Sequence, residues 1–325
     1  MKRRDFLAAT SLPAIAAGFP AQSLAQAAYP AQPVKVLVGF PPGTAADLAG
    51  RAVADAMARR LGQPFVLENR TGAGSNIAAK ALATAQPDGY TLFVSTIANT
   101  INAAFAGSTT VDPLKDFLPI TLIGNVPNVL VVHPSVPVNS VSDLIRLARS
   151  RPGELSYASS GIGTSPHLSG ELFETMTGSK VAHIPYRGST PAVTDLLGGQ
   201  VQFMFAPASS VLQHVRAGKL KALAVTSPKR TAIAPELPTM DEAGLKGFET
   251  SVWVGLVAPV NTPADVVAKL RAAAHAAIDA PEVQAAYKVQ GIDPLKTSPE
   301  EFTRYMRSEA TRWRKLIQDA GIKPE

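Results

Sequence analysis

Residues 34–47 read VKVLVGFPPGTAAD and contain a strand, a glycine-bearing turn and a helix start in immediate succession. The apolar run 34–40 predicts a strand, and apolar residues recur at helical spacing through 47–61. Thr44 and Asp47 have the spacing of a capping box, in which a hydroxyl residue and a later acid satisfy helix N–H groups. This unit predicts an α/β protein, in which ligands bind at loops that leave the carboxyl ends of parallel strands.

The same alternation of strand and helix continues along the chain. Strands at 65–68 and 91–95 with a helix at 76–86 complete a βαβαβ pattern, which is typical of a mostly parallel sheet flanked by helices. Further strands are predicted at 129–132, 155–158, 181–186, 201–205, 220–225 and 252–258, and further helices at 143–150, 166–177, 191–197 and 210–217. A length of 325 residues fits about two domains. The strand at 252–258 is expected to return to the first sheet.

Composition excludes several classes of protein. The chain is 46% hydrophobic and 17% charged, which is too apolar for a disordered polyelectrolyte. It has no cysteine, so disulfides, thiolate metal sites and cysteine nucleophiles are excluded. The net charge of +6 is modest and no basic stripe is interleaved with aromatic residues, so we expect no nucleic-acid partner.

The first 27 residues have the features of an export signal. Residues 2–5 read KRRD, an apolar stretch extends from Phe6 to Ala17, and residues 25–27 read AQA, a small-x-small cleavage site. The arginine pair is typical of twin-arginine signals and predicts a periplasmic protein. A membrane anchor is the alternative, but the apolar stretch is shorter than the ~20 residues of a membrane span. Removal of residues 1–27 lowers the net charge to 6 − 3 + 1 = +4.

A second glycine-bearing loop resembles the first. Residues 159–166 read SSGIGTSP, follow a predicted strand and precede a predicted helix. Ser165-Pro166 places a hydroxyl residue at N-cap and proline at N1, and Thr190-Pro191, Thr262-Pro263 and Ser298-Pro299 repeat this pattern. Helix N-termini offer free N–H groups and a positive dipole end. The two loops, one in each domain, could therefore hold a small anion from both sides.

Motifs of catalysis are missing from the sequence. It has no GxSxG elbow, Walker A loop, HExxH or Ser-x-x-Lys, and its five histidines are scattered. We therefore expect no enzyme, no metal and no cofactor. A hydrolase that uses Ser160 or His167 in the cleft remains the alternative from a different class.

A series of short motifs resembles one known family. In order along the chain from residue 29, these motifs are Tyr29-Pro30, Phe40-Pro41-Pro42-Gly43, Glu68-Asn69-Arg70-Thr71-Gly72, Pro87-Asp88-Gly89-Tyr90, Gly161 to Thr164 with His167, Tyr186-Arg187-Gly188, Gly198-Gly199-Gln200-Val201 and Leu237-Pro238-Thr239. In this order they resemble the motifs of the Bordetella uptake gene (Bug) family, the extracytoplasmic solute-binding proteins of tripartite tricarboxylate transporters.

The resemblance implies a two-lobed, type II-like periplasmic-binding-protein fold that closes by a hinge on a small carboxylate and delivers it to the membrane subunits of the transporter. Together with the strand pattern, it places domain 1 at 28–130 and 251–325 and domain 2 at 131–250. A monomer is expected. Carried onto this chain, with the two loops above, the ligand-binding residues are Phe40, Pro42, Gly43, Thr44, Thr96, Asn99, Ser160, Gly161, Gly163, Thr164, Ser165, His167, Tyr186, Arg187, Ala208 and Ser209.

The sequence restricts the chemical class of the ligand but does not identify the compound. Ala206-Pro207-Ala208 replaces an acidic residue of amino-acid-binding relatives, which favours a plain or aromatic mono- or dicarboxylate over an amino acid. Two alternatives stay open for Arg187, a partner for a distal carboxylate or a surface arginine paired with an acid. Tyr186 either lines the cleft or packs in the core. A sensory protein that presents its ligand to a membrane receptor is an alternative function.

Overall fold

The computed structural model describes residues 29–105 and 111–319, so the predicted export signal at residues 1–27 lies outside the described residues. The strands are β1 (Val34–Val38), β2 (Phe65–Asn69), β3 (Thr91–Thr96), β4 (Phe117–Val132), β5 (Ser156–Ser159), β6 (Ala182–Pro185), β7 (Phe203–Pro207), β8 (Lys221–Val225), β9 (Ser251–Pro259) and β10 (Asp293–Pro294). The helices are α1 (Ala45–Leu61), α2 (Asn76–Ala83), α3 (Ile97–Phe105), α4 (Pro113–Asp116), α5 (Val141–Ser150), α6 (Ser165–Thr177), α7 (Ser189–Leu197), α8 (Ala208–Arg216), α9 (Ala264–Ile278), α10 (Pro281–Gln290) and α11 (Pro299–Asp319).

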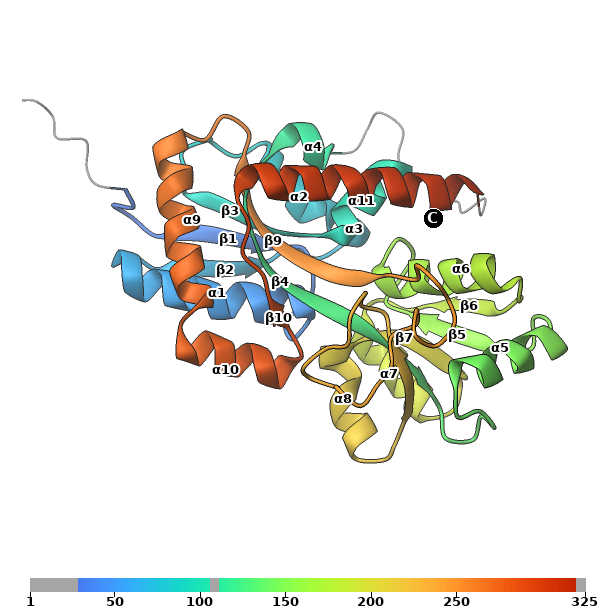
Figure 1. Cartoon of the computed structure of the whole chain (residues 1–325). Helices are drawn as coiled ribbons and strands as arrows, with labels where there is room; N and C mark the ends of the chain where they lie inside the picture. The colour runs from blue at the N-terminus through green and yellow to red at the C-terminus, as the bar shows by residue number, and fades with distance from the viewer. Residues whose placement is uncertain (1–28, 106–110, 320–325) are drawn as a thin grey trace, which may run out of the picture.

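The strands pair in the order β2-β1-β3-β9-β4-β7-β5-β6, with β8 and β10 also paired to β4 (Figure 1). The α/β class is confirmed, and β9 returns to β3 as expected. The sheets are mixed rather than mostly parallel. Strands β1, β2 and β3 pair in parallel, but β9 runs antiparallel to both β3 and β4. Likewise β5, β6 and β7 are parallel, whereas β4 runs antiparallel to β7 and β8.

Both faces of the first group of strands are buried, which explains why they read as apolar runs. In β1, Val34, Val36 and Val38 pack on one face with α1 and α9, while Leu37 points to the opposite face. That second core contains Trp253 of β9 and side chains of α2, α3 and α11. The period of two along a strand thus assigns alternate residues to two different cores.

The strands around β5 and β7 have an aromatic core of their own. Tyr157, Phe173, Phe203, Phe205 and Phe248 are all buried there, with ring centroids between 5.6 and 6.2 Å apart in neighbouring pairs. Such offset or tilted pairs are favoured over face-to-face sandwiches. This core lies between the strands and α5 and α6.

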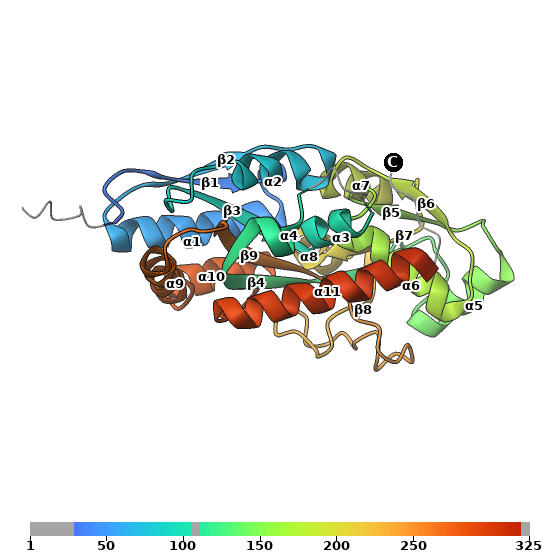
Figure 2. The same ribbon diagram turned by 90° about the horizontal axis from the view of Figure 1, so that it is seen from above.

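Strand β4 connects the two groups of strands. Figure 1 shows β4 and β9 crossing the middle of the molecule, and Figure 2 shows α11 extending along its long axis. The first part of β4 pairs with β9 as far as Pro127, and from Asn128 onward β4 pairs with β7 and β8. Only residues 129–132 of this 16-residue strand were predicted. The register with β9 shifts at 119–121 and again at 122–124, as expected of β-bulges.

Several helix starts differ from the predicted caps. Ser298 and Glu301 form the capping box of α11, with N–H···O distances of 2.8 and 3.1 Å. The N-cap residue is Thr164 rather than Ser165 in α6, and Gly188 rather than Thr190 in α7. Thr262 bonds the Pro259 carbonyl instead of capping α9. None of the helices formed by the described residues is both long and apolar enough to cross a membrane.

Candidate functional site

A cleft lies at the carboxyl ends of β1, β3, β5, β6 and β7, beside the start of β9. Loops and helix starts from both groups of strands line it, as expected for ligand sites in α/β sheets. None of the described residues that line it carries a charge. They are Phe40, Pro41, Thr44, Ala45, Ala46, Thr96, Ile97, Ala98, Ser160, Thr164, Ser165, Pro166, Gly188, Ser189, Pro207 and Val252.

Five helices begin at this cleft, namely α1, α3, α6, α7 and α8. The first N–H groups of a helix have no partner within the helix. Ala45, Ala46 and Ser165 line the cleft, and no hydrogen bond to their N–H groups occurs within residues 29–105 and 111–319. The positive ends of five helix dipoles therefore meet in a space without charged side chains. Such a site is suited to an anion.

The loop that precedes α1 is held by its own side chains. Thr44 is the N-cap residue, but its hydroxyl turns back and donates to the Pro41 carbonyl at 2.8 Å. Asp47 accepts the N–H of Gly43 at 3.0 Å rather than that of Thr44, which corrects the predicted capping box. Asn69 binds Asp47 and also donates to the Phe40 carbonyl at 2.9 Å. The loop thus keeps the first N–H groups of α1 free.

The loop that precedes α6 repeats this arrangement. The Thr164 hydroxyl donates to the Gly161 carbonyl at 2.6 Å, and His167 accepts the N–H of Gly163 at 3.2 Å. Gly43 and Gly163 have matching left-handed φ values of 81° and 75°. A side chain with a β-carbon is strained in that conformation, so glycine precedes threonine in both loops. Asp47 and His167 therefore occupy equivalent positions in the two loops.

A third helix start follows a related pattern. Thr96 lies at the start of α3, where its hydroxyl accepts the N–H of Ala98 at 3.3 Å. Asn99 accepts the N–H of Thr96 at 3.0 Å and donates to Ser75 at 3.4 Å. Asn99 is buried and shapes the helix start rather than lining the cleft. The three helix starts share one spacing, a threonine followed three residues later by a side chain that accepts a backbone N–H, at residues 44–47, 96–99 and 164–167.

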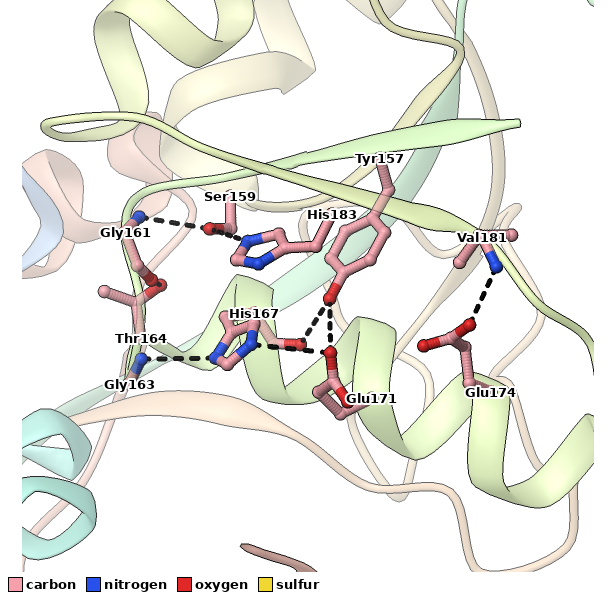
Figure 3. A network of polar contacts seen from close by, with 10 residues as sticks. All are labelled: Tyr157, Ser159, Gly161, Gly163, Thr164, His167, Glu171, Glu174, Val181 and His183. Atoms are coloured by element: carbon pink, nitrogen blue, oxygen red, sulfur yellow. Dashed lines mark hydrogen bonds and ion pairs between the residues drawn. The ribbon is translucent and has the colours of Figure 1, made fainter. Parts of the chain in front are cut away.

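His167 belongs to a buried network behind the second loop (Figure 3). Its Nε2 lies 3.4 Å from Glu171 Oε1, which also accepts the Tyr157 hydroxyl at 3.0 Å. Although burial opposes ionisation, His167 and Tyr157 hold the pKa of Glu171 below its usual value. The His167 ring is 3% exposed and stacks on His183 with centroids 4.3 Å apart. His167 therefore supports the loop from behind and is not among the lining residues.

His183 completes the network on the far side of the loop. Its Nε2 lies 2.6 Å from Ser159 Oγ, and that oxygen accepts the N–H of Gly161 at 3.1 Å. Burial lowers the pKa of His183 to about 4, with the neighbouring His167 acting in the same direction and Glu171 against it. The same burial, with Glu171 nearby, raises the pKa of Tyr157. Both groups are therefore neutral at physiological pH.

The sixteen predicted site residues fall into two groups, those that line the cleft and those that do not. Phe40, Thr44, Thr96, Ser160, Thr164 and Ser165 line the cleft, with the Ser160 and Ser189 hydroxyls 2.8 Å apart. Ten do not line it: Pro42, Gly43, Asn99, Gly161, Gly163, His167, Tyr186, Arg187, Ala208 and Ser209. The backbone of several of these shapes the lining loops, as described for Gly43, Gly161 and Gly163.

Tyr186 and Arg187 lie outside the cleft lining. The Tyr186 hydroxyl donates to Asp195 at 2.7 Å and its ring packs against the core, which agrees with the core-packing alternative. Burial and the Asp195 carboxylate raise the pKa of Tyr186 to about 12. Arg187 is exposed, and no ion pair of its guanidinium is found among the described residues.

The predicted site residues include six of the sixteen lining residues, and the other ten were not named individually. Ala45, Ala46, Ile97 and Ala98 contribute through helix starts, where any small residue would serve, so their side chains carry no motif. Gly188 and Ser189 were missed because the hydroxyl–proline pattern assigned the start of α7 to Thr190. Pro41, Pro166, Pro207 and Val252 complete the missed residues.

Comparison with known proteins agrees with this architecture. Residues 49–322 match the TctC family, the tripartite tricarboxylate transporter family receptor. BugT of Bordetella pertussis is 36% identical over 297 residues, which cover 91% of each chain. An R. palustris protein solved with adipate has 37% identity and a TM-score of 0.85, over 91% of this chain and 100% of that chain. MatC from Rhodopseudomonas palustris, solved with bound malate, has 31% identity and a TM-score of 0.81, over 89% of this chain and 100% of its own. The protein accordingly belongs to the TctC/Bug family of tripartite tricarboxylate transporter receptors, and its fold is that of the family's periplasmic binding proteins.

Proposed function

We propose that this protein is an exported, monomeric solute-binding protein of the periplasm that captures a small carboxylate in the cleft and delivers it to the membrane subunits of a tripartite tricarboxylate transporter. The observation that carries the proposal is the meeting of five helix N-termini on a cleft without charged lining residues. The family membership supports delivery to a transporter of this type.

A carboxylate fits this cleft better than a neutral solute of the same shape. Hydrogen bonds to a charged acceptor contribute about 1.5–3 kcal/mol each, roughly twice as much as neutral ones. The free N–H groups of Ala45, Ala46 and Ser165 provide such donors from two helices. Hydroxyl groups of Ser160 and Ser189 add further polar atoms to the same wall. Recognition thus requires no buried lysine or arginine.

The rest of the lining favours a plain or aromatic mono- or dicarboxylate. Phe40, Ile97, Pro207 and Val252 give the cleft an apolar side suited to methylene groups or a ring. Two relatives were solved with adipate and with malate, which are both small dicarboxylates. No acidic residue lines the cleft to pair with an α-ammonium group, so an amino acid is disfavoured.

We further propose that the ligand closes two lobes about a hinge. The lobes are residues 28–130 with 251–325, and residues 131–250. The chain crosses between them in β4 and at the start of β9, where Pro127 pairs with Ser251. The cleft is lined from both lobes, by Thr44 and Ala46 on one side and by Thr164 and Ser189 on the other. A ligand that contacts both walls binds the closed state better and shifts the equilibrium toward it.

The alternative of a cleft hydrolase lacks support in the geometry. Ser160 shares its hydrogen bond with Ser189, and the His167 ring lies buried between the Gly163 N–H and Glu171. A serine nucleophile needs a base within hydrogen-bond reach. His167 has both ring nitrogens engaged elsewhere and does not serve as that base.

The test is a thermal-shift screen of the mature protein against mono-, di- and tricarboxylates, aromatic acids and amino acids, followed by calorimetry. Adipate and its uncharged diamide, adipamide, form a matched pair that differs in the carboxylate alone. At a concentration 100 times its Kd, a true ligand stabilises the protein by about 2.7 kcal/mol. We expect at least one acid to reach this value while adipamide does not. Equal stabilisation by acids and their amides, or by none of the acids, would contradict the proposed function.

A further inference from the structure

The loop at residues 160–164 is held from behind by the buried His167 and the half-buried His183. Figure 3 shows the rings of His167 and His183 stacked between this loop and the Tyr157 side chain. The N–H of Gly163 points to His167 Nδ1, and the N–H of Gly161 points to Ser159 Oγ, which in turn contacts His183 Nε2. Both glycine N–H groups are thus directed inward, away from the cleft.

The contact with Gly163 fixes the tautomer of His167. A backbone N–H can only donate, so Nδ1 must accept and carry no hydrogen. The hydrogen of the neutral ring is then on Nε2, which faces the Glu171 carboxylate at 3.4 Å. A proton added at Nδ1 would place two donors against each other and break the bond to Gly163.

His183 contacts the loop through Ser159. Ser159 Oγ accepts the Gly161 N–H and lies 2.6 Å from His183 Nε2. In the tautomer with an unprotonated Nε2, the single O–H of Ser159 donates to His183 and both of its contacts are satisfied. Burial, which lowers the pKa of His183 to about 4, keeps this ring neutral at physiological pH.

The first loop differs at the equivalent position. Gly43 donates to the carboxylate of Asp47, which can only accept hydrogen bonds as long as it is ionised. Arg51 and Asn69 keep that carboxylate ionised by donating to it at 2.8 and 3.0 Å. The wall formed by α6 thus depends on an imidazole where the wall formed by α1 depends on a carboxylate.

We propose that His167 and His183 are positioning residues that, as neutral acceptors, hold the loop at residues 160–164 in the geometry that leaves the first N–H groups of α6 free for a carboxylate. The proposal rests on the proposed function of this cleft. It predicts that loss of the acceptor at Nδ1 of His167 releases Gly163 and weakens the binding of a carboxylate by one wall only.

Titratable groups face His167 from several elements. Glu171 on α6 lies 3.4 Å from its Nε2, and His183 on β6 stacks against the ring. The Tyr157 hydroxyl on β5 donates to Glu171, and also contacts the His167 carbonyl oxygen at 3.4 Å. One turn further along α6, Glu174 accepts the N–H of Val181, and the positive charge of Lys180 favours the ionised form of Glu174. Strand β7, which also packs on α6, contributes no titratable side chain.

Two substitutions separate the two ring nitrogens of His167. In His167→Asn, the amide oxygen can occupy the place of Nδ1 and accept the Gly163 N–H. In His167→Gln, the longer amide reaches the place of Nε2 and can donate only to Glu171. We expect the Kd of H167N for adipate at neutral pH to lie within about threefold of that of the unmodified protein. The Kd of H167Q should be about tenfold higher than that of the unmodified protein, because loss of one ordinary hydrogen bond changes affinity by about this factor. His214→Asn, on α8 and outside the network, is the matched control.

Recovery of binding in H167N but not in H167Q is a readout that a merely structural role would not move, because only the Asn amide oxygen takes the place of Nδ1. Equal adipate affinities of H167N and H167Q would overturn the proposal.

The tautomers can be measured without any ligand, which separates this inference from the proposed function. Nitrogen-15 chemical shifts of the free protein at neutral pH should show an unprotonated Nδ1 in His167 and an unprotonated Nε2 in His183. A protonated Nδ1 in His167 would refute the positioning role even if adipate binds. Correct tautomers in a protein that binds no carboxylate would instead refute the proposed function alone.

Discussion

Asp47 holds the first loop through three hydrogen bonds although its side chain is almost completely buried. Asp47→Asn removes the charge and turns one acceptor into a donor that faces Gly43 or Arg51. We expect a loss of about 1–3 kcal/mol in the free energy of unfolding, measured by urea at neutral pH. Asp55→Asn makes the same change on the exposed face of α1 and should cost about 0.5 kcal/mol or less. Equal costs would show that Asp47 does not hold the loop.

The contribution of Asp47 to the free energy of unfolding should decrease in acid. Burial opposes ionisation, but hydrogen bonds from Arg51, Asn69 and Gly43 outweigh it and hold the pKa of Asp47 below its ordinary value of 3.8. The stabilisation is therefore complete above about pH 4 and is lost as the pH falls through the pKa of the folded state. The difference between the unmodified protein and D47N should shrink in that acidic range and stay constant at higher pH.

His183 should make the protein sensitive to mild acid. Burial lowers the pKa of the folded-state ring from 6.5 to about 4, so the unfolded chain binds this proton first. Stability is complete above about pH 6.5 and decreases until the pH reaches about 4. His183→Gln keeps an acceptor for Ser159 without a titrating ring. Allowing for partial exposure of the ring, we expect the unmodified protein to lose about 2 kcal/mol more than H183Q between urea titrations at the two ends of this range. Parallel pH profiles would contradict the shifted pKa.

At this scale the sequence predicted the loops better than the roles of individual side chains. Glycine followed by threonine at a strand end was enough to locate both lining loops, because few residues tolerate the left-handed backbone there. The role of His167 was not predictable, since its orientation depends on Glu171, Tyr157 and His183, which come together only in the folded protein.

Among the elements, α11 has the most complete cap. Ser298 and Glu301 satisfy each other's backbone N–H groups, and Trp313 and Phe302 anchor the helix in the core. Ser298→Ala should lower the free energy of unfolding by about 1 kcal/mol. Ser308→Ala, on the exposed side of the same helix, is the matched control and should change it by about 0.5 kcal/mol or less. A loss of the same size in both variants would show that the capping box contributes nothing.

Helices and strands with one clear hydrophobic periodicity were predictable from the sequence. Elements that pair with different partners along their length were not. Helix α1 follows its apolar spacing to Leu61 and ends at Gly62 with a left-handed φ of 73°. Strand β4 contains Pro119 and Pro127, which usually mark strand ends. Bulges and a change of partners from β9 to β7 accommodate these prolines, and neither feature leaves a local signal. The antiparallel direction of β9 likewise depends on packing between distant segments.

At the scale of the whole molecule, the two loops can act together only because β4 and β9 join the two groups of strands. Thr226 follows β8 and bonds both the N–H and the carbonyl of Asn128, at the point where β4 changes partners. The Asn128 amide reaches Ser165 of the second loop at 2.6 Å. The crossing point and one cleft wall are thus mechanically connected, so a rotation of the lobes at the crossing would move that wall.

Closure predicts a change in overall size when ligand binds. Small-angle scattering of the mature protein with saturating adipate, or the best acid of the screen, should give a smaller radius of gyration than the free protein, while adipamide should leave it unchanged. The reason is that a carboxylate makes stronger hydrogen bonds to both walls than a neutral amide does, and a ligand can shift the two states only by its difference in affinity for them. A hundredfold preference for the closed state corresponds to about 2.7 kcal/mol, enough to close a protein whose open state prevails tenfold when empty. An acid that raises the melting temperature without compaction would show binding to one wall alone, and the hinge mechanism would then be wrong.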